Sequence, residues 1–190
     1  MSSPQQLEIR HAVPGDAAAI ATVHVEGYDS AHRGILDPAS LAVRNFELRR
    51  RVWSERLADP PARSFVLVAV EGGEVVGFVS GRTAHPDEDG GLGEGRVENI
   101  YVLSRCRPRS RVAAPLMEAS LDAMAELGYT IGFGFVAEGN DRSRNFLRGL
   151  GWHHDGYVIE VEGLRQYRIR HDLPSSARSP SGEGPREPSA

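Results

Sequence analysis

The chain has 190 residues and carries 26 acidic residues against 22 basic ones, for a net charge of −4. This length suits a single domain with its own core, and the slight excess of acid excludes a protein that attracts nucleic acid by overall charge. The sequence has one cysteine, no apolar run of membrane length and no basic-then-apolar leader. We therefore expect a cytoplasmic protein with no internal disulfide and no membrane partner. No group of histidine, cysteine and carboxylate residues has metal-ligand spacing, so we expect no metal site.

The first half of the sequence predicts a strand, two helices and a β-hairpin. Apolar residues at three- and four-residue spacing follow the break at residues 14–16, and two β-branched runs flank Gly72-Gly73. The expected elements are a strand at 7–10, a helix to about Tyr28, a loop at 28–37, a helix from Asp37 to Asp59 with Leu41, Phe46, Leu48, Val52, Trp53 and Leu57 as candidate core residues, and strands at 64–71 and 74–82.

The second half predicts further strands and helices in alternation. Residues 84–95 are acidic and rich in glycine, so we expect a loop whose carboxylates either attract a cationic substrate or are only solvated. The chain is polar from residue 174 onward, which predicts a disordered tail at 174–190 after one domain at 1–173. The expected elements are a strand at 96–103, a helix ending at Gly128, a strand at 129–137, a short helix between Asn140 and Gly151, and strands at 157–161 and 164–170.

The loop that follows residues 96–103 is basic, with arginines at Arg105, Arg107, Arg109 and Arg111. A helix N-terminus offers unpaired backbone amides and the positive end of the helix dipole, so the loop predicts a phosphate site. A solvated basic turn is the alternative interpretation. Pro115 favours a helix start near Ala114, because proline is tolerated only near the first turn.

Three segments share a recognisable pattern: residues 65–78, the strand Ile100-Tyr101-Val102-Leu103 with its following helix, and residues 140–152, which read Asn-x-x-Ser-x-x-Phe-x-x-x-x-Gly-Trp. Together with the order of elements, they resemble the GNAT superfamily of acyl-CoA-dependent N-acyltransferases over residues 7–172. The resemblance implies an α/β (α+β) fold, with a mixed, mostly antiparallel sheet of six or seven strands flanked by about four helices. It also implies an enzyme that transfers an acetyl group from acetyl-CoA to the amine of a small molecule or peptide.

The same resemblance places the cofactor between two strands. The strand that contains Ile100 would separate from the strand that begins at Thr130, and the pantetheine arm would lie in the gap. The pyrophosphate would lie at the start of the following helix. The residues expected to bind the cofactor are Tyr101, Val102, Leu103, Arg107, Arg109, Ser110, Arg111, Val112, Ala113, Asn140 and Ser143.

Two features depart from the family pattern. The phosphate loop has Pro108, Arg111 and Ala113 where relatives have glutamine or arginine, then glycine, then glycine or alanine. Leu147 stands where many relatives have a tyrosine that protonates the leaving thiolate. Two other hypotheses therefore stand beside acetyl transfer: a ligand-binding or scaffold protein that has lost acyl transfer, and an enzyme for a reaction that needs no coenzyme A.

Glu98 is the expected general base, because relatives keep a carboxylate near this position. It shares a strand face with Ile100 and Val102, so apolar neighbours would raise its pKa. An ion pair with Arg82 or Arg96 is the alternative interpretation.

A tyrosine is the expected replacement for the missing acid, with Tyr157 and Tyr101 as the two candidates. The loop at 28–37 would meet the substrate through Tyr28, His32 and Arg33, with surface packing as the alternative. A homodimer is left open.

Overall fold

The computed structural model describes residues 6–37, 45–85, 91, 93–106, 108, 110–161 and 163–174. No helix within these residues is long and apolar enough to cross a membrane. In chain order the elements are β1 (Leu7–His11), the short 3-10 turn η1 (Pro14–Asp16), α1 (Ala17–His32), α3 (Phe46–Ala58), β2 (Phe65–Glu71), β3 (Glu74–Thr83), β4 (Glu94–Val102), α4 (Ser110–Glu126), β5 (Ile131–Ala137), α5 (Asp141–Gly149), β6 (His153–Val161) and β7 (Leu164–Asp172).

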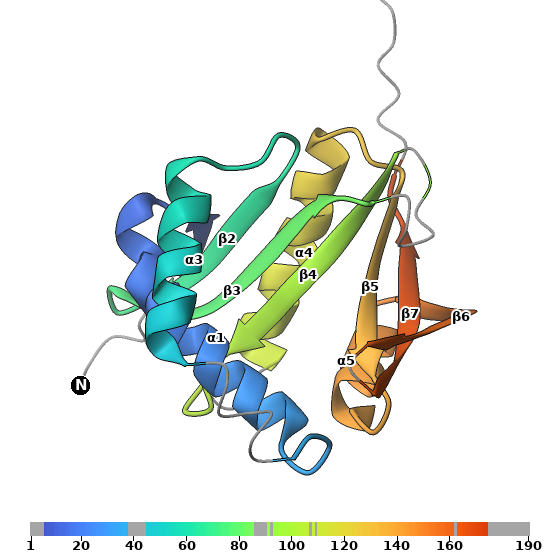
Figure 1. The fold of residues 1–190 in the computed structure, drawn as a ribbon. Helices are drawn as coiled ribbons and strands as arrows, with labels where there is room; N and C mark the ends of the chain where they lie inside the picture. Colours follow the sequence, from blue (N-terminus) through green and yellow to red (C-terminus); the bar gives the residue numbers. More distant parts are fainter. Residues whose placement is uncertain are drawn as a thin grey trace, which may run out of the picture.

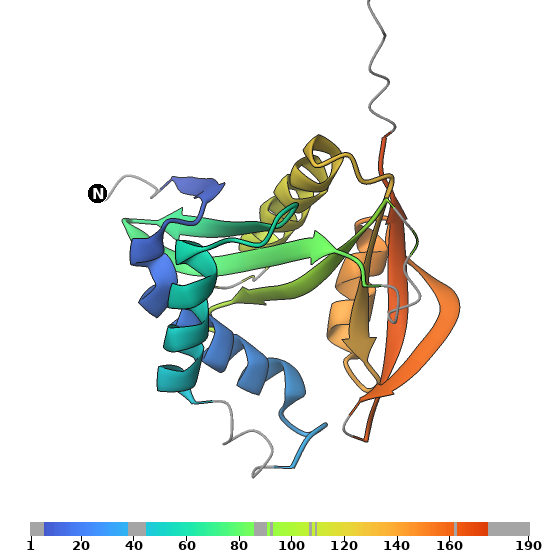
Figure 2. The same ribbon diagram turned by 45° about the horizontal axis from the view of Figure 1, so that its top comes forward.

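The strands form one seven-stranded sheet in the order β1-β2-β3-β4-β5-β7-β6. Neighbouring strands are antiparallel except β4 and β5, which run parallel. The parallel pairing is short, because it joins residues 94–96 to residues 131–133 and then stops. Figure 2 shows β4 and β5 close together at one end and far apart at the other. The structure confirms the predicted mixed sheet and the predicted separation of these two strands.

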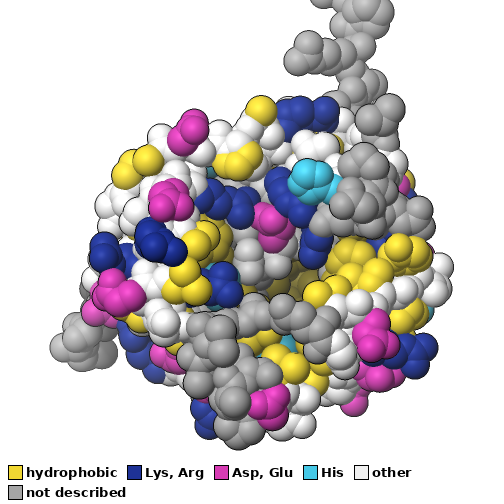
Figure 3. All heavy atoms as spheres, in the orientation of Figure 1, with side chains coloured by type: hydrophobic (Ala, Val, Ile, Leu, Met, Phe, Trp, Pro, Cys, Tyr) yellow, Lys and Arg dark blue, Asp and Glu magenta, His cyan; other side chains and the backbone are white. Residues whose placement is uncertain are grey.

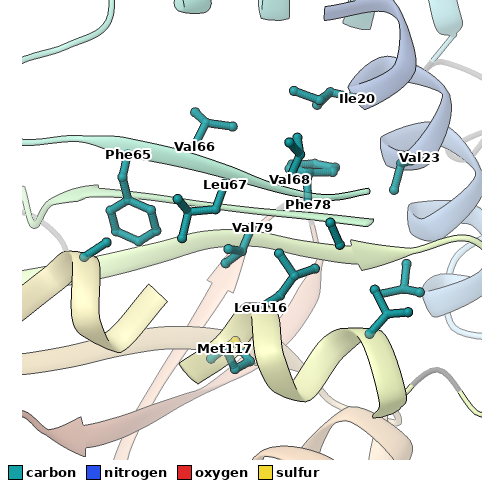
Figure 4. Packing of buried hydrophobic residues seen from close by; sticks show 14 of the residues in the cluster. Ile20, Val23, Phe65, Val66, Leu67, Val68, Phe78, Val79, Leu116 and Met117 are labelled. Atoms are coloured by element: carbon teal, nitrogen blue, oxygen red, sulfur yellow. The ribbon is translucent and has the colours of Figure 1, made fainter. Parts of the chain in front are cut away.

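Helices cover both faces of the sheet. α1 and α3 lie on one face and α4 lies on the other (Figure 1). The apolar spacing in α4 predicts one buried side, and Leu116, Met117 and Met124 are indeed enclosed. The core between these layers (Figure 4) includes Ile20, Val23, Phe65, Val66, Leu67, Val68, Phe78, Val79, Leu116 and Met117.

α1 is longer than the sequence predicts. It continues to His32, so Tyr28 lies in the helix and not in the expected loop. Gly27 shows why the helix can lie here: a Cβ atom on Gly27 would be 2.6 Å from the Cβ atom of Tyr101. Only glycine allows this approach, which holds the last turns of α1 beside the end of β4.

α3 buries a narrower side than expected. The predicted core positions Phe46, Leu48 and Val52 are exposed, whereas Trp53 is buried and Leu57 packs partly against the core. Trp53 and Leu57 are four residues apart and therefore share one side of the helix. Leu48 and Val52 lie off that side, whereas Phe46 lies on it but is the first residue of the helix. The prediction was wrong for all three, which are exposed.

α4 begins at Ser110, earlier than the predicted start near Ala114. Pro115 therefore lies inside the helix, where it lacks the amide that would bond to the carbonyl of Arg111. β6 also begins earlier than predicted, at His153. The predicted strand at 157–161 is the part of β6 that follows an irregular register between His154 and Val158.

Four predicted features lie outside the described residues: the core contact of Leu41, the cofactor contacts of Arg107 and Arg109, the acidic part of the loop at 86–90, and the tail from residue 175.

Candidate functional site

A cavity of about 660 Å³ lies where the end of β4 meets α1, α4 and α5. Ile100, Tyr101 and Val102 line it from β4, while Ser110 and Ala113 line it from the first turn of α4. The cavity lies on the side on which β4 has lost its parallel neighbour, so the opening follows directly from the sheet topology.

A second cavity of about 240 Å³ lies in the gap between β4 and β5. The two cavities are adjacent, since six residues line both of them: Ala31, Ile100, Tyr101, Asn140, Ser143 and Leu147. Two molecules bound one in each cavity would therefore meet beside Ile100 and Tyr101.

The backbone of β4 presents polar groups to this meeting point. The N–H of Leu103 donates to the carbonyl of Val76 at 2.9 Å, so it is engaged on the β3 side. Successive residues of a strand direct their N–H and C=O groups to opposite sides, which turns those of Val102 and Ile100 toward the gap. Leu103 is buried and lines neither cavity, so its expected backbone contact with a cofactor does not fit this geometry.

The start of α4 faces the larger cavity with small side chains. Val112 is fully buried and can offer only its backbone. The guanidinium of Arg111 turns away to Glu71, with Nη1 to Oε1 at 2.6 Å and Nη2 to Oε2 at 3.0 Å. The hydrogen bond from Arg111, with its charge, lowers the pKa of Glu71. The Arg111 side chain, expected to bind the cofactor, therefore pairs with Glu71 and lines neither cavity.

Some backbone amides in the first turn of α4 can still donate a hydrogen bond to a ligand. The N–H of Arg111 donates to the carbonyl of Pro108 at 3.1 Å. The other early amides of α4 have no partner within the helix, because the first four N–H groups of any helix lack one. Such amides favour the binding of an anion at this wall of the cavity.

Asn140 and Ser143 lie together at the start of α5 and line both cavities. The side-chain oxygen of Asn140 accepts from the N–H of Ser143 at 3.2 Å, which caps the helix. Leu147, one turn further on, is buried between the cavities and has no proton to donate.

Glu98 lies between two arginines. Its Oε2 is 2.6 Å from Nη1 of Arg56 and its Oε1 is 2.8 Å from Nε of Arg82. Burial by itself would raise the pKa of Glu98, but the charges and hydrogen bonds of the two arginines outweigh it and lower the pKa. The expectation of a raised pKa is therefore wrong. The alternative ion pair with Arg82 is confirmed, and α3 adds Arg56, which the strand pattern did not reveal.

Tyr28 and His32 lie side by side on the last turns of α1, with ring centroids 4.0 Å apart, and both line the smaller cavity. Nδ1 of His32 is 2.9 Å from the carbonyl oxygen of Tyr28. A carbonyl only accepts, so Nδ1 donates and the lone pair of the neutral ring is on Nε2. Arg33 lines the larger cavity instead and forms an ion pair with Asp29.

Two other residues, Tyr157 and Cys106, lie apart from the cavities or lack suitable chemistry. Tyr157 stacks on Arg168, whose guanidinium carbon is 4.4 Å from the ring centre, and Tyr157 lines neither cavity. Burial raises the pKa of the Cys106 thiol, which makes a nucleophilic role unfavourable. Within the described residues, no group of three histidine, cysteine or carboxylate side chains is placed to hold a metal ion.

Sequence reasoning missed Arg56 and the importance of Gly27. Arg56 gave no signal, since nothing in its own helix marks it as a partner of β4. Gly27 did give one: a glycine on the apolar side of a helix costs stability and commonly marks a close approach.

Several solved structures share this fold. One is the PaiA N-acetyltransferase of Thermoplasma acidophilum in complex with coenzyme A, with a TM-score of 0.69 and 13% identity over 88% of this chain and 99% of that one. The ribosomal-protein-alanine N-acetyltransferase of Brucella melitensis has a TM-score of 0.67 and 22% identity over 87% of this chain and 99% of that one. YncA of Salmonella typhimurium, solved with acetyl-CoA, has a TM-score of 0.66 and 18% identity over 90% of this chain and 96% of that one.

Identities this low establish a shared fold alone, and no curated protein matches the chain. The sequence itself carries the stronger evidence. Residues 31–152 match the acetyltransferase (GNAT) family, and this range is more than half of the chain. It contains the end of β4, the start of α4 and the whole of α5, which line much of the larger cavity. The match confirms the resemblance seen in the motifs, and the chain belongs to the acetyltransferase (GNAT) family.

Proposed function

We propose that this protein is an N-acetyltransferase that moves the acetyl group of acetyl-CoA to the amine of a small molecule or peptide. The observation that carries the proposal is the contact between two cavities at Ile100 and Tyr101, on the open edge of β4. Such an arrangement holds two reactants with their reacting groups together, which removes much of the entropic cost of a reaction between two molecules.

Acetyl-CoA fits the larger cavity. The early amides of α4 would bind its pyrophosphate, and the small side chains of Ser110 and Ala113 let the phosphates approach them. Asn140 and Ser143 would contact the pantetheine arm from α5. Coenzyme A in the PaiA structure and acetyl-CoA in the YncA structure support this assignment by similarity of fold.

The backbone amide of Val102 is our candidate for stabilising the oxyanion. It faces the gap, as the hydrogen bond of Leu103 to Val76 requires. Acetyl-CoA supplies the acetyl group and a thiolate leaving group. A thiol with an ordinary pKa of about 8.5 leaves readily, so Leu147 in place of a proton donor is compatible with transfer.

Two residues that line the smaller cavity can accept the amine proton, Glu98 and His32. We favour His32, because a carboxylate whose pKa is lowered by two guanidinium groups is a weak base. The Nδ1 bond to the carbonyl of Tyr28 holds the ring with Nε2 as its basic nitrogen. Tyr157 as the acid stays a prediction, and its place outside both cavities does not favour it.

Calorimetric titration with acetyl-CoA, followed by an acetylation assay on a panel of amines, tests the proposal. We expect saturable binding, with coenzyme A release that depends on an added amine. The chain contains no lysine, so its side chains offer no competing amine and the background should be low. Absence of heat from micromolar to millimolar acetyl-CoA would reject the proposal and favour a scaffold role or a reaction without coenzyme A.

A further inference from the structure

The acidic and basic side chains that line the smaller cavity already have partners within the protein. The carboxylate of Glu98 lies between the guanidinium groups of Arg56 and Arg82. Nδ1 of His32 donates to a backbone carbonyl, and Arg96 also has a partner. Figure 3 shows an acidic side chain flanked by basic ones near the centre of this face of the molecule. Among the described residues, the cavity thus has no unpaired charge with which to hold a charged acceptor.

Two neutral amide side chains that line the same cavity do have hydrogen-bonding groups to offer. The side chain of Gln166 has no hydrogen-bond partner within the described part of the chain, so its carbonyl oxygen and its N–H groups are all available. Asn99 donates from Nδ2 to Oγ of Ser80 at 3.0 Å, while its carbonyl oxygen accepts from no described residue. A ligand that fills the cavity displaces water from these groups and must replace the hydrogen bonds that water made.

Gln166 points to the same face of the sheet as Arg96. It lies opposite Ala137 on β5, and side chains directly opposite each other in two strands point to one face. Phe135, two residues before Ala137, shares that face. The guanidinium of Arg96 lies over the ring of Phe135, 5.1 Å from its centre. The amide of Gln166 is therefore on the side of the gap from which Arg96 also borders the smaller cavity.

Asn99 lies across the gap from Gln166. Beyond the pair of Arg96 and Phe133, β4 reaches Asn99 after three residues, and β5 reaches Ala137, the partner of Gln166, after four. The two amides are thus at nearly the same level of the gap, one on each side of it. One small molecule in the smaller cavity can therefore contact both of them.

A molecule held by the two amides can also direct an amine toward the cofactor. Tyr101 lies two residues beyond Asn99 and lines both cavities. His32, the base that we favour, lines the smaller cavity as well. The attacking amine must be neutral to react, so its place beside His32 needs no opposing charge.

On the basis of the proposed acetyl transfer, we infer that the acceptor is a small amine that also carries a neutral carboxamide, which Gln166 and Asn99 bind. A carboxamide has both kinds of group that these residues need, since its N–H groups donate to Oδ1 of Asn99 and its carbonyl accepts from Nε2 of Gln166. A carboxylate only accepts and leaves Oδ1 of Asn99 without a donor, and an alkyl group pairs with neither residue. A volume of about 240 Å³ limits the acceptor to a small molecule.

Acceptors of equal shape test the inference in the unaltered protein. β-Alaninamide, β-alanine and isoamylamine share one skeleton and differ in the end group, which is a carboxamide, a carboxylate or a pair of methyl groups. Glycinamide, glycine and isobutylamine repeat the comparison on a shorter skeleton. On the better skeleton, we expect kcat/KM per free amine to be at least about fivefold higher for the carboxamide than for the other two, as one net hydrogen bond provides.

A variant assigns the effect to Gln166. Gln166→Leu keeps the approximate size of the side chain and removes its hydrogen-bonding groups. It should raise KM for the preferred carboxamide at least about fivefold, while kcat/KM for the alkylamine of the same skeleton stays within about twofold. Gln6→Leu makes the same change at an exposed residue before β1 and is the matched control. An equal loss for both amines in Gln166→Leu would show a merely structural role and overturn the inference.

The outcomes separate this inference from acetyl transfer itself. Equal or better use of the carboxylates or the alkylamines would overturn the inference and leave the acetyltransferase standing. If no amine is acetylated, the proposed function fails, and binding of a carboxamide alone then decides. Butanamide at millimolar concentration should still give a saturation-transfer NMR signal with the unaltered protein and with Gln6→Leu but not with Gln166→Leu. A signal with all three proteins, or with none, would overturn the carboxamide site.

Discussion

The guanidinium of Arg111 lies flat against the carboxylate of Glu71, with its two donors 2.6 and 3.0 Å from the two acceptor oxygens. This pairing occupies the arginine that the basic loop appeared to offer to a phosphate. Arg105 is likewise engaged, in an ion pair with Glu74 at 2.5 Å. The two described arginines of the loop thus bind the ends of the β2–β3 hairpin, and the backbone of α4 faces the cavity instead.

Arg111→Gln should therefore change the dissociation constant of acetyl-CoA by no more than about threefold, as expected for an exposed charge outside the site. Ala113→Asp should weaken binding at least about 10-fold, because it places a negative charge at the cavity end of α4. Ala113→Asn has the same size without the charge and serves as the control. Calorimetric titration measures all three, and a 10-fold loss in Arg111→Gln would show that Arg111 leaves Glu71 for the cofactor.

Gly27→Ala should destabilise the protein by about 1–3 kcal/mol, as overpacking does. The added methyl would lie 2.6 Å from the Cβ atom of Tyr101, so α1 would have to move from β4. Gly149→Ala in α5 meets nothing within 4 Å and should be neutral or stabilising by up to about 1 kcal/mol. Urea unfolding of both variants checks this, and an unchanged midpoint for Gly27→Ala would contradict the fit of helix to strand.

Local signals predicted much of the fold. The hairpin at Gly72 and Gly73 could be found from the sequence because both glycines adopt the positive φ that its turn requires. The end of α1 could not, because the helix continues to His32 and its last turns contact Tyr101, which is far along the chain. Local propensity carries no information on such a contact.

The candidate site likewise has contacts that the sequence could predict and contacts that it could not. The sequence could predict that Asn140 and Ser143 lie close together, because a capping residue and the residue that it caps are three positions apart at the start of a helix. The environment of Glu98 could not be read, since Arg56 approaches it from another layer of the fold. That contact and the ion pair with Arg82 together reverse the direction expected for the pKa of Glu98.

Glu98→Gln should lower the free energy of unfolding by about 1–3 kcal/mol at neutral pH, because it leaves Arg56 and Arg82 without their shared carboxylate. The folded pKa of Glu98 is lowered from its usual 4.5, so its contribution is present above that value and lost as pH falls through the folded pKa. The difference in the free energy of unfolding between the unaltered protein and Glu98→Gln should therefore shrink from pH 6 to pH 3. Urea unfolding across this range measures it, with exposed Glu118→Gln as the control; a constant difference would contradict the lowered pKa.

His32→Ala should reduce kcat/KM by at least about 100-fold, as loss of a general base does, while the affinity for acetyl-CoA stays within about twofold. Added imidazole should restore part of the rate, since it can occupy the vacated space in the smaller cavity and accept the amine proton. A merely structural role would give no such rescue. His11→Asn on exposed β1 is the control, and Glu98→Gln should retain at least about a tenth of the rate if His32 is the base. A large loss in Glu98→Gln, with little change in His32→Ala, would return the catalytic role to Glu98 and show that a carboxylate between two guanidinium groups remains basic enough for the reaction.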